Sequence, residues 1–161
     1  KDKADGEAGA LSVWEKNKMK EKHQETFSDA VNDVPKVFPA LMQAQKVAKR
    51  VEKGGWGYAD YESAEQKLFE EISELKAARD AGDKKEIASE LGDVLMSAVN
   101  LGREVGADCE EALLDTVKKI KRRFTAYESA VLADGKDVNA LSDEEKEAYY
   151  RAMKAAEEKG E

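Results

Sequence analysis

The chain has 161 residues and a formal net charge of −8 at pH 7. This length favours one domain. An acidic chain lacks the basic face that long nucleic acids require, so we exclude nucleic acid as a partner. No apolar stretch reaches the ~18 residues that a membrane-spanning helix needs, so we expect no membrane partner and a cytoplasmic protein. With 39% charged and 41% hydrophobic residues, the composition favours amphipathic helices over strands.

The N-terminal part of the chain is polar and interrupted by prolines. The first ten residues show no hydrophobic periodicity, and we interpret them as a frayed end. A polar helix is predicted over residues 11–27, and Pro35 and Pro39 then interrupt helical structure. We therefore assign residues 1–34 to a frayed N-terminus with a linker helix, and residues 35–161 to the main domain.

Two helices are predicted next. Apolar residues at three- and four-residue steps predict a helix from Ala40 to Lys53, which a glycine-rich loop over residues 54–58 ends. A second helix is predicted from Tyr61 to Ala81, with Leu68 at the centre of its apolar stripe. Gly82 and Asp83 then leave so short a connection that the following helix must be an antiparallel neighbour.

The remaining helices carry wide apolar faces. The helix predicted from Lys84 to Val105 is apolar over so wide an arc that we expect burial on more than one side, and hence a homodimer. Ser142 and Glu145 predict a capping box that begins the last helix. The helix between them has a regular stripe that we interpret as core or dimer interface: Leu113, Val117, Ile120, Phe124, Tyr127 and Val131. The fold class is all-α, an antiparallel helical bundle.

Two pairs of carboxylates lie on the two adjacent central helices. Glu71 and Glu74 are three apart on one helix, and Glu90 and Asp93 are three apart on the next. Partners at this spacing share one surface of a helix, and antiparallel packing can bring both pairs to one groove. Four carboxylates would repel one another, and a hard cation such as Mg²⁺ or Mn²⁺ removes that repulsion. From spacing alone, a metal site and an ordinary solvated acidic face remain equally open.

The residues around these pairs resemble a known family. The segments F-E-E-I-S-E-L (69–75) and E-L-G-D-V-L (90–95) resemble the E-E-x-x-E and E-x-x-D signature of the MazG family, which are all-helical nucleoside triphosphate pyrophosphohydrolases. The segments V-P-K-V-F-P-A-L (34–41), V-N-L-G-R (99–103) and K-I-K-R-R-F (119–124) are similar to the same family. The likeness covers roughly residues 14–154, and the region around Trp14 resembles the linker between two MazG modules. We therefore expect the chain to be the C-terminal half of a longer protein.

This resemblance implies a MazG-like catalytic domain, similar to a four-helix bundle, that is dimeric and has an extra N-terminal helical segment. It implies that Glu71, Glu74, Glu90 and Asp93 bind Mg²⁺, with Mn²⁺ as the alternative ion. Glu70 and Glu71 are the implied catalytic residues, although helical geometry directs Glu70 towards solvent. The substrate-binding residues are Lys67, Asn100, Lys119, Arg122, Arg123 and Tyr150. Among them Lys119 and Arg123 are neighbours four apart, and Arg122 is expected to point elsewhere.

The function implied by the resemblance is hydrolysis of ribo- or deoxynucleoside triphosphates to monophosphate and pyrophosphate, with a house-cleaning or nucleotide-pool role. Two alternatives remain open. One is a related helical pyrophosphatase of the dUTPase or phosphoribosyl-ATP hydrolase type, which would share the ligands. The other is a helical dimerisation module without catalytic activity.

Overall fold

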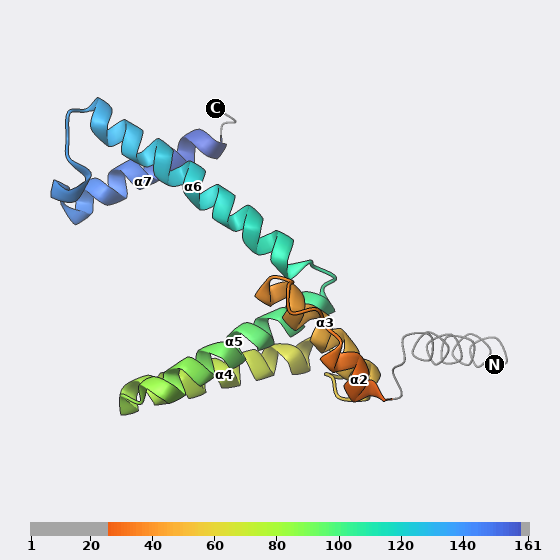
Figure 1. Cartoon of the computed structure of the whole chain (residues 1–161). Coiled ribbons are helices and arrows are strands. Elements are labelled where there is room, and N and C mark those ends of the chain that lie inside the picture. The colour runs from red at the N-terminus through yellow and green to blue at the C-terminus, as the bar shows by residue number, and fades with distance from the viewer. Residues whose placement is uncertain (1–25, 159–161) are drawn as a thin grey trace. The chain divides into compact units, whose positions relative to one another are not determined.

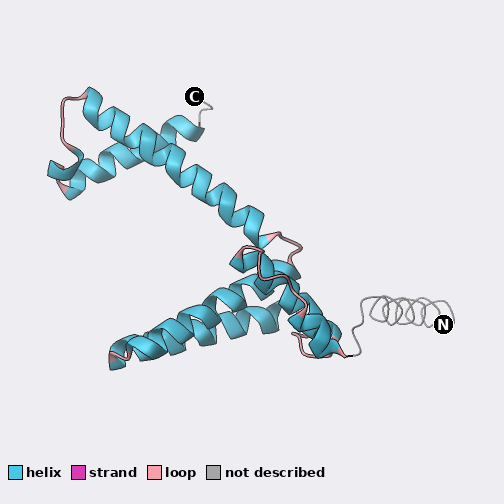
Figure 2. Ribbon diagram, viewed as in Figure 1, coloured by secondary structure: helices cyan, strands magenta, loops and turns pink. Residues whose placement is uncertain are grey.

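The computed structural model of the protein describes residues 26–158, in which helices are joined by loops (Figure 2). It holds six α-helices and one short 3-10 helix, and no strand occurs among these residues. None of the helices in the described part combines the length and the hydrophobicity needed to cross a bilayer. In chain order (Figure 1) they are α2 (Phe27–Asn32), α3 (Ala40–Lys53), α4 (Tyr61–Ala81), α5 (Lys84–Glu104), α6 (Cys109–Ala133), η1 (Val138–Ala140) and α7 (Asp143–Glu158).

Local signals in the sequence set where the central helices begin and end. The Asp60 side chain accepts a hydrogen bond from the Ser63 amide (2.9 Å) and caps α4. The Asp83 side chain accepts two from amides in the first turn of α5. Between these helices Gly82 has a φ of 73°, a left-handed conformation that glycine adopts without strain. The predicted bounds of α3 and α4 are confirmed, and α5 ends one residue earlier than predicted.

The first described helix differs from the prediction. A polar helix was predicted to end near Phe27, but α2 begins there. Thr26 caps α2 in a capping box with Asp29, because the Asp29 amide donates to Thr26 Oγ1 (3.1 Å) and the Thr26 amide donates to Asp29 Oδ2 (2.8 Å). α2 buries no residue, so hydrophobic periodicity carries no signal for it. The rest of the predicted helix lies outside the described residues.

The described residues divide into two compact units, of which unit 1 ends at Glu110 and unit 2 begins at Glu111. Unit 1 contains α2 to α5 and the first two residues of α6, and unit 2 contains the rest of α6 with η1 and α7. The structure does not fix the position of one unit relative to the other. A domain boundary near residue 34, the four-helix bundle and the dimer stay predictions.

Unit 1 is built on the antiparallel pair of α4 and α5, which lie side by side (Figure 1). Ala64 and Ala78 are buried on α4, as is Val99 on α5, and the small alanines let the helices approach closely. Glu71 lies midway between the two alanines, seven residues from each, and is also buried. Seven-residue steps follow one face of a helix. The prediction that Leu68 marks the centre of the buried face was therefore wrong, since that centre passes through Glu71.

The helix α3 packs against α2 and α5, with Ala48 buried. Gln45 on α3 also holds the start of α6. Its Nε2 donates to the Ala107 carbonyl (2.9 Å), and its Oε1 accepts from the Cys109 amide (3.1 Å). The second bond satisfies an amide that a helix leaves unpaired in its first turn. Gln45 thus fixes the loop that leaves α5 against α3.

In unit 2, which holds most of α6 together with η1 and α7, the buried hydrophobic residues are Val131, Leu141 and Met153. The predicted capping box begins α7, since the Ser142 amide donates to Glu145 Oε2 (2.9 Å) and the Glu145 amide donates to Ser142 Oγ (3.2 Å). The prediction of this box is confirmed.

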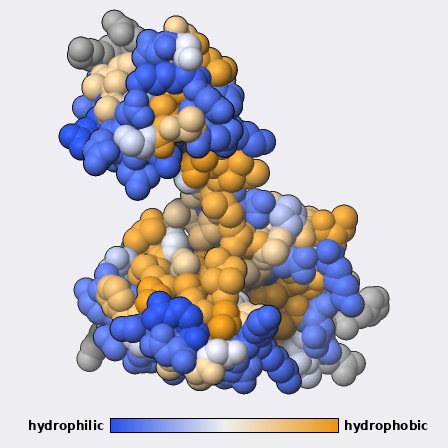
Figure 3. All heavy atoms as spheres, turned by 90° about the vertical axis from the view of Figure 1, so that its left-hand side faces the viewer, coloured by the Kyte–Doolittle hydropathy of each residue, from blue (hydrophilic) through white to orange (hydrophobic). Residues whose placement is uncertain are grey.

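Large hydrophobic side chains remain exposed on α4, α5 and α6, and Figure 3 shows the resulting hydrophobic surface in orange. On α6 the predicted stripe is largely open, with Leu113 51%, Ile120 59% and Phe124 55% exposed. On the hairpin, Phe69 of α4 and Leu95 of α5 are 57% and 52% exposed. Hydrophobic side chains are thus exposed on α4 and α5 in unit 1 and on α6 in unit 2, and exposed apolar patches are typical of association sites.

Candidate active site

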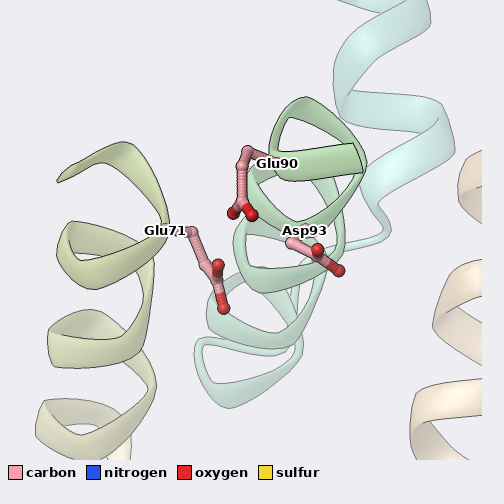
Figure 4. A group of neighbouring side chains, drawn as sticks. All are labelled: Glu71, Glu90 and Asp93. Atoms are coloured by element: carbon pink, nitrogen blue, oxygen red, sulfur yellow. The ribbon is translucent and has the colours of Figure 1, made fainter. Parts of the chain in front are cut away.

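Three carboxylates gather where α4 faces α5. Glu71 comes from α4, and Glu90 and Asp93 come from α5 (Figure 4). One oxygen from each lies within 4.8 Å of the other two, and we refer to these three residues as the acidic cluster. The antiparallel hairpin therefore brings together three of the four predicted metal ligands.

Glu71 is the most buried member of the acidic cluster, at 6% exposure. Its Oε1 lies 2.7 Å from Nζ of Lys67, one turn earlier on α4. The hydrogen bond to Glu71 is the main cause that raises the pKa of the Lys67 ammonium. A buried charge needs a partner, and Lys67 supplies it. The structure thus places Lys67, a predicted substrate-binding residue, at the acidic cluster.

Glu90 has a carboxylate oxygen that protein groups leave unsatisfied. Its Oε2 is buried and has no hydrogen-bond partner among the described residues. Burial, followed by the negative charge of Glu74 and Glu86, raises the pKa of Glu90. A buried oxygen without a donor is costly, and hard divalent cations favour carboxylate oxygens as ligands. The acidic cluster therefore fits a divalent cation.

Two other predicted residues lie beside the acidic cluster. Glu74 is exposed and contributes no oxygen to the three that gather in the described part of the chain, although its charge acts on Glu90. The side chain of Glu70 is 49% exposed and lies 3.7 Å from Lys67 Nζ. Glu70 and Glu74 line a shallow hollow together with Phe69. The prediction that Glu70 points towards solvent is confirmed.

A cavity of about 570 Å³ opens beside the acidic cluster within unit 1. Lys67 and Glu71 of α4 line this cavity, as do Asp93 and Asn100 of α5. The seven-residue spacing of Asp93 and Asn100 predicts that they share one face of the helix. The other polar and aromatic lining residues include Trp56, Tyr58, Ser97 and Arg103, none of which was predicted from the sequence as a site residue. Arg103 follows Asn100 by three residues, so extending the same helix face by one turn would have found it.

The other predicted substrate-binding residues belong to unit 2, so the structure fixes no distance from them to the acidic cluster. Glu157 on α7 accepts hydrogen bonds from Arg123 Nε (2.8 Å) and from Arg122 Nη2. Arg122 thus holds α7 to α6, which is a role in the fold, and the direction of Arg122 relative to the substrate stays a prediction. Lys119 is exposed. Tyr150 is 44% exposed and shares a cavity of about 470 Å³ with Arg123.

The pairing of Glu157 predicts an acid-dependent loss of stability. Hydrogen bonds from Arg123 first, and then from Arg122, lower the pKa of Glu157 from 4.5 to about 2. Because this pKa is lowered by folding, the pairing stabilises the protein above pH 4.5 and the benefit is lost as the pH falls towards 2. We expect Glu157→Gln to lower the melting temperature at pH 7 and to match the parent near pH 2.

Thermal melts across this pH range measure that difference. The control is Glu147→Gln, which removes an exposed pair with Arg151 and should show little effect at any pH. A difference between parent and Glu157→Gln that stays constant from neutral to acid would contradict the prediction.

Residues 59–126 match the model of the MazG nucleotide pyrophosphohydrolase domain. The chain is 33% identical over 156 residues to a nucleoside triphosphate pyrophosphohydrolase of Escherichia coli (strain K12), which covers 96% of this chain and 59% of that protein. It is 32% identical over 145 residues to the nucleoside triphosphate pyrophosphohydrolase/pyrophosphatase MazG of Thermotoga maritima, covering 90% and 55%. It thus spans somewhat more than half the length of these curated relatives. The matched segment contains the whole acidic cluster, and the chain carries a MazG nucleotide pyrophosphohydrolase domain.

Proposed function

We propose that this protein hydrolyses ribo- or deoxynucleoside triphosphates to the monophosphate and pyrophosphate, with Mg²⁺ as cofactor. The observation that carries the proposal is an acidic cluster, fit for a divalent cation, whose Glu71 and Asp93 line a cavity of small-molecule size. The relatives named as nucleoside triphosphate pyrophosphohydrolases support the same reaction. Removal of unwanted nucleotides from the cellular pool is the role that such an activity serves.

Glu71, Glu90 and Asp93 would hold the cation, with Glu74 next to them as a fourth carboxylate. When bound, Mg²⁺ or Mn²⁺ supplies positive charge that offsets the triphosphate and polarises water. A bound cation would offer a partner to the buried Glu90 Oε2, which has none among the described residues.

The basic side chains bind and orient the phosphates. Lys67 lies at the acidic cluster and lines the cavity, which supports a role for its ammonium in binding the phosphate chain. Lys119 and Arg123 are neighbours on α6 and offer further charge for the departing pyrophosphate, with Arg122 beside them. Tyr150 offers a ring on which a base can stack.

The remaining polar groups act on water and on the nucleoside. Attack by water breaks the bond between the α- and β-phosphoryl groups and releases pyrophosphate. Glu71 faces the cavity and is the better placed of the two predicted catalytic carboxylates to orient this water, while Glu70 is placed only to assist from outside. Asn100 lines the same cavity and can donate to the nucleotide through its side-chain amide.

We further propose that the active protein is a homodimer. The exposed faces of α4, α5 and α6 carry hydrophobic side chains of the size and number that a permanent subunit interface buries. A second copy of the chain offers the same faces and can cover them by two-fold symmetry.

Pyrophosphate release tests the proposal. The full chain is incubated with a panel of ribo- and deoxynucleoside triphosphates, with Mg²⁺ or with a chelator. We expect monophosphate and pyrophosphate in equal amounts with Mg²⁺ and none with the chelator. Turnover of dUTP alone would favour the dUTPase alternative, and turnover of phosphoribosyl-ATP alone would favour the other. No product from any nucleotide would favour the inactive dimerisation module and overturn the proposal.

A further inference from the structure

The cavity beside the acidic cluster has a second end that the proposed chemistry does not use. Arg103 lies ten residues after Asp93 on α5, which is about 15 Å further along the helix axis. Arg103 lines the cavity there with Trp56 and Tyr58 of the loop before α4. The phosphates and the base occupy opposite ends of a nucleotide. With the triphosphate at the acidic cluster, the base therefore lies towards Arg103.

Arg103 is held in place by a carboxylate from another helix. Its Nη2 donates to Oε2 of Glu52 on α3, and the Arg103 side chain is only 14% exposed. The loop rests on the same glutamate, since a Cβ added to Gly57 would lie 2.9 Å from Glu52 Cγ. Glu52 thus positions both the guanidinium and the aromatic loop at this end of the cavity.

The guanidinium retains donors for a ligand. The hydrogen bond shown for Arg103 within the described residues uses Nη2, and the group has five N–H donors in a rigid fork. Acceptors on the edge of a base match this fork. Guanine presents O6 and N7 together, whereas adenine places an amino group where guanine has O6. A donor fork therefore discriminates between two purines of nearly equal size.

We propose that Arg103, positioned by Glu52, determines base specificity by donating to the edge of the bound base and favours a keto purine such as guanine over adenine. This inference rests on the proposed function, because the acidic cluster sets the direction of the nucleotide. It is distinct from stacking by Tyr150, since stacking acts on the face of a base and tolerates every base.

A purely structural role for Arg103 predicts something different. A cation in the last turn of α5 also interacts favourably with the helix dipole, and the pair with Glu52 ties α3 to α5. Loss of such contacts lowers the melting temperature and weakens the binding of all nucleotides alike. Loss of a base contact instead weakens the binding of guanine nucleotides selectively.

Calorimetric titration with GMP and AMP in Mg²⁺ buffer separates the two roles. We expect the parent to bind GMP at least about 10-fold more tightly than AMP. Arg103→Met should weaken the affinity for GMP by about 10- to 100-fold and change the affinity for AMP less than about 3-fold. Arg103→Lys keeps the charge and the aliphatic stem but loses the fork, so it should lose the same preference. The matched control is Arg79→Met, which removes an arginine paired with Asp80 outside the cavity.

Equal loss of GMP and AMP in Arg103→Met, or a GMP preference that survives in both Arg103 variants, would overturn the inference. So would a parent that binds the two equally. Neither ligand has a phosphoanhydride bond to cleave, so the titration reports on Arg103 whether or not the protein releases pyrophosphate from triphosphates. Failure of the proposed function and failure of this inference are therefore seen in different measurements.

Discussion

Replacing Glu71 with glutamine or Asp93 with asparagine is expected to reduce pyrophosphate release by more than about 100-fold. Each amide keeps the shape of the side chain but removes a negative charge from the acidic cluster. A weaker hold on the cation misplaces the reacting groups, and small misplacements are costly to rate. Glu70→Gln should have a smaller effect, because Glu70 lies in the hollow outside the cavity.

Melting curves and steady-state pyrophosphate release on the same samples make this measurement. Asp93 is exposed, so Asp93→Asn should keep the parent melting temperature. Glu71→Gln breaks the ion pair with Lys67, so we expect this variant to melt at a lower temperature. Its activity is therefore measured well below that melting temperature. The control Glu62→Gln changes an exposed carboxylate in the first turn of α4 and should retain full activity. Parent-like turnover by the Glu71 and Asp93 variants would refute the assignment of the acidic cluster.

The protein is expected to behave in solution as a particle of twice its 17.8 kDa chain mass. Leu95 on α5 and Leu113 on α6 are each about half exposed, and a partner chain would cover them. A carboxylate at either position would lose its hydration on association without gaining a partner. We expect Leu95→Glu and Leu113→Glu each to weaken the dimer by at least about 30-fold, which corresponds to about 2 kcal/mol.

Light scattering coupled to size exclusion over a range of concentrations measures this equilibrium. Thr125→Glu adds the same charge to an exposed position of α6 away from the apolar stripe, so it serves as the matched control. A parent protein of 17.8 kDa at micromolar concentration would rule out the dimer. Unchanged association in both leucine variants would place the interface elsewhere.

The helix ends could be predicted from sequence because their causes are local. The Asp60 side chain and the pair of Ser142 and Glu145 bond to amides within three residues, and Gly82 ends α4 through its left-handed conformation. The structure has these helix ends where the signals predict them. The short helix α2 was not predicted, because the prediction relied on hydrophobic periodicity. Its capping box is present in the sequence, but six residues that bury nothing leave no hydrophobic periodicity.

The centre of the buried face could not be predicted, because a hydrophobic pattern does not say what covers it. Ile72 on α4 fits the apolar stripe as well as Leu68 does, yet it is 45% exposed. A residue that packs inside the chain and one that faces a partner surface give the same periodicity. The small residues Ala64 and Ala78 mark the close approach to α5, and Glu71 between them was therefore placed at the edge of the stripe instead of its centre.

Contacts between residues that are far apart in the chain could not be predicted from the sequence either. Glu157 is 34 residues from Arg123, so no spacing rule links them. Glu52 and Arg103 are 51 residues apart and meet only because α3 packs on α5. By contrast, three of the four predicted metal ligands came together, because two short spacings and one tight turn determine their approach.

The ion pair between Lys67 and Glu71 has a bearing on the order in which ligands assemble. The ammonium already neutralises the most buried carboxylate, so α4 can pack on α5 with that charge balanced from within the same helix. A cation approaching Glu71 by itself must compete with Lys67. A triphosphate offers the ammonium an alternative anion, so nucleotide and cation entering as a complex release Glu71 without leaving Lys67 unpaired. If the protein has the proposed function, this exchange of ion partners would couple tight cation binding to nucleotide binding.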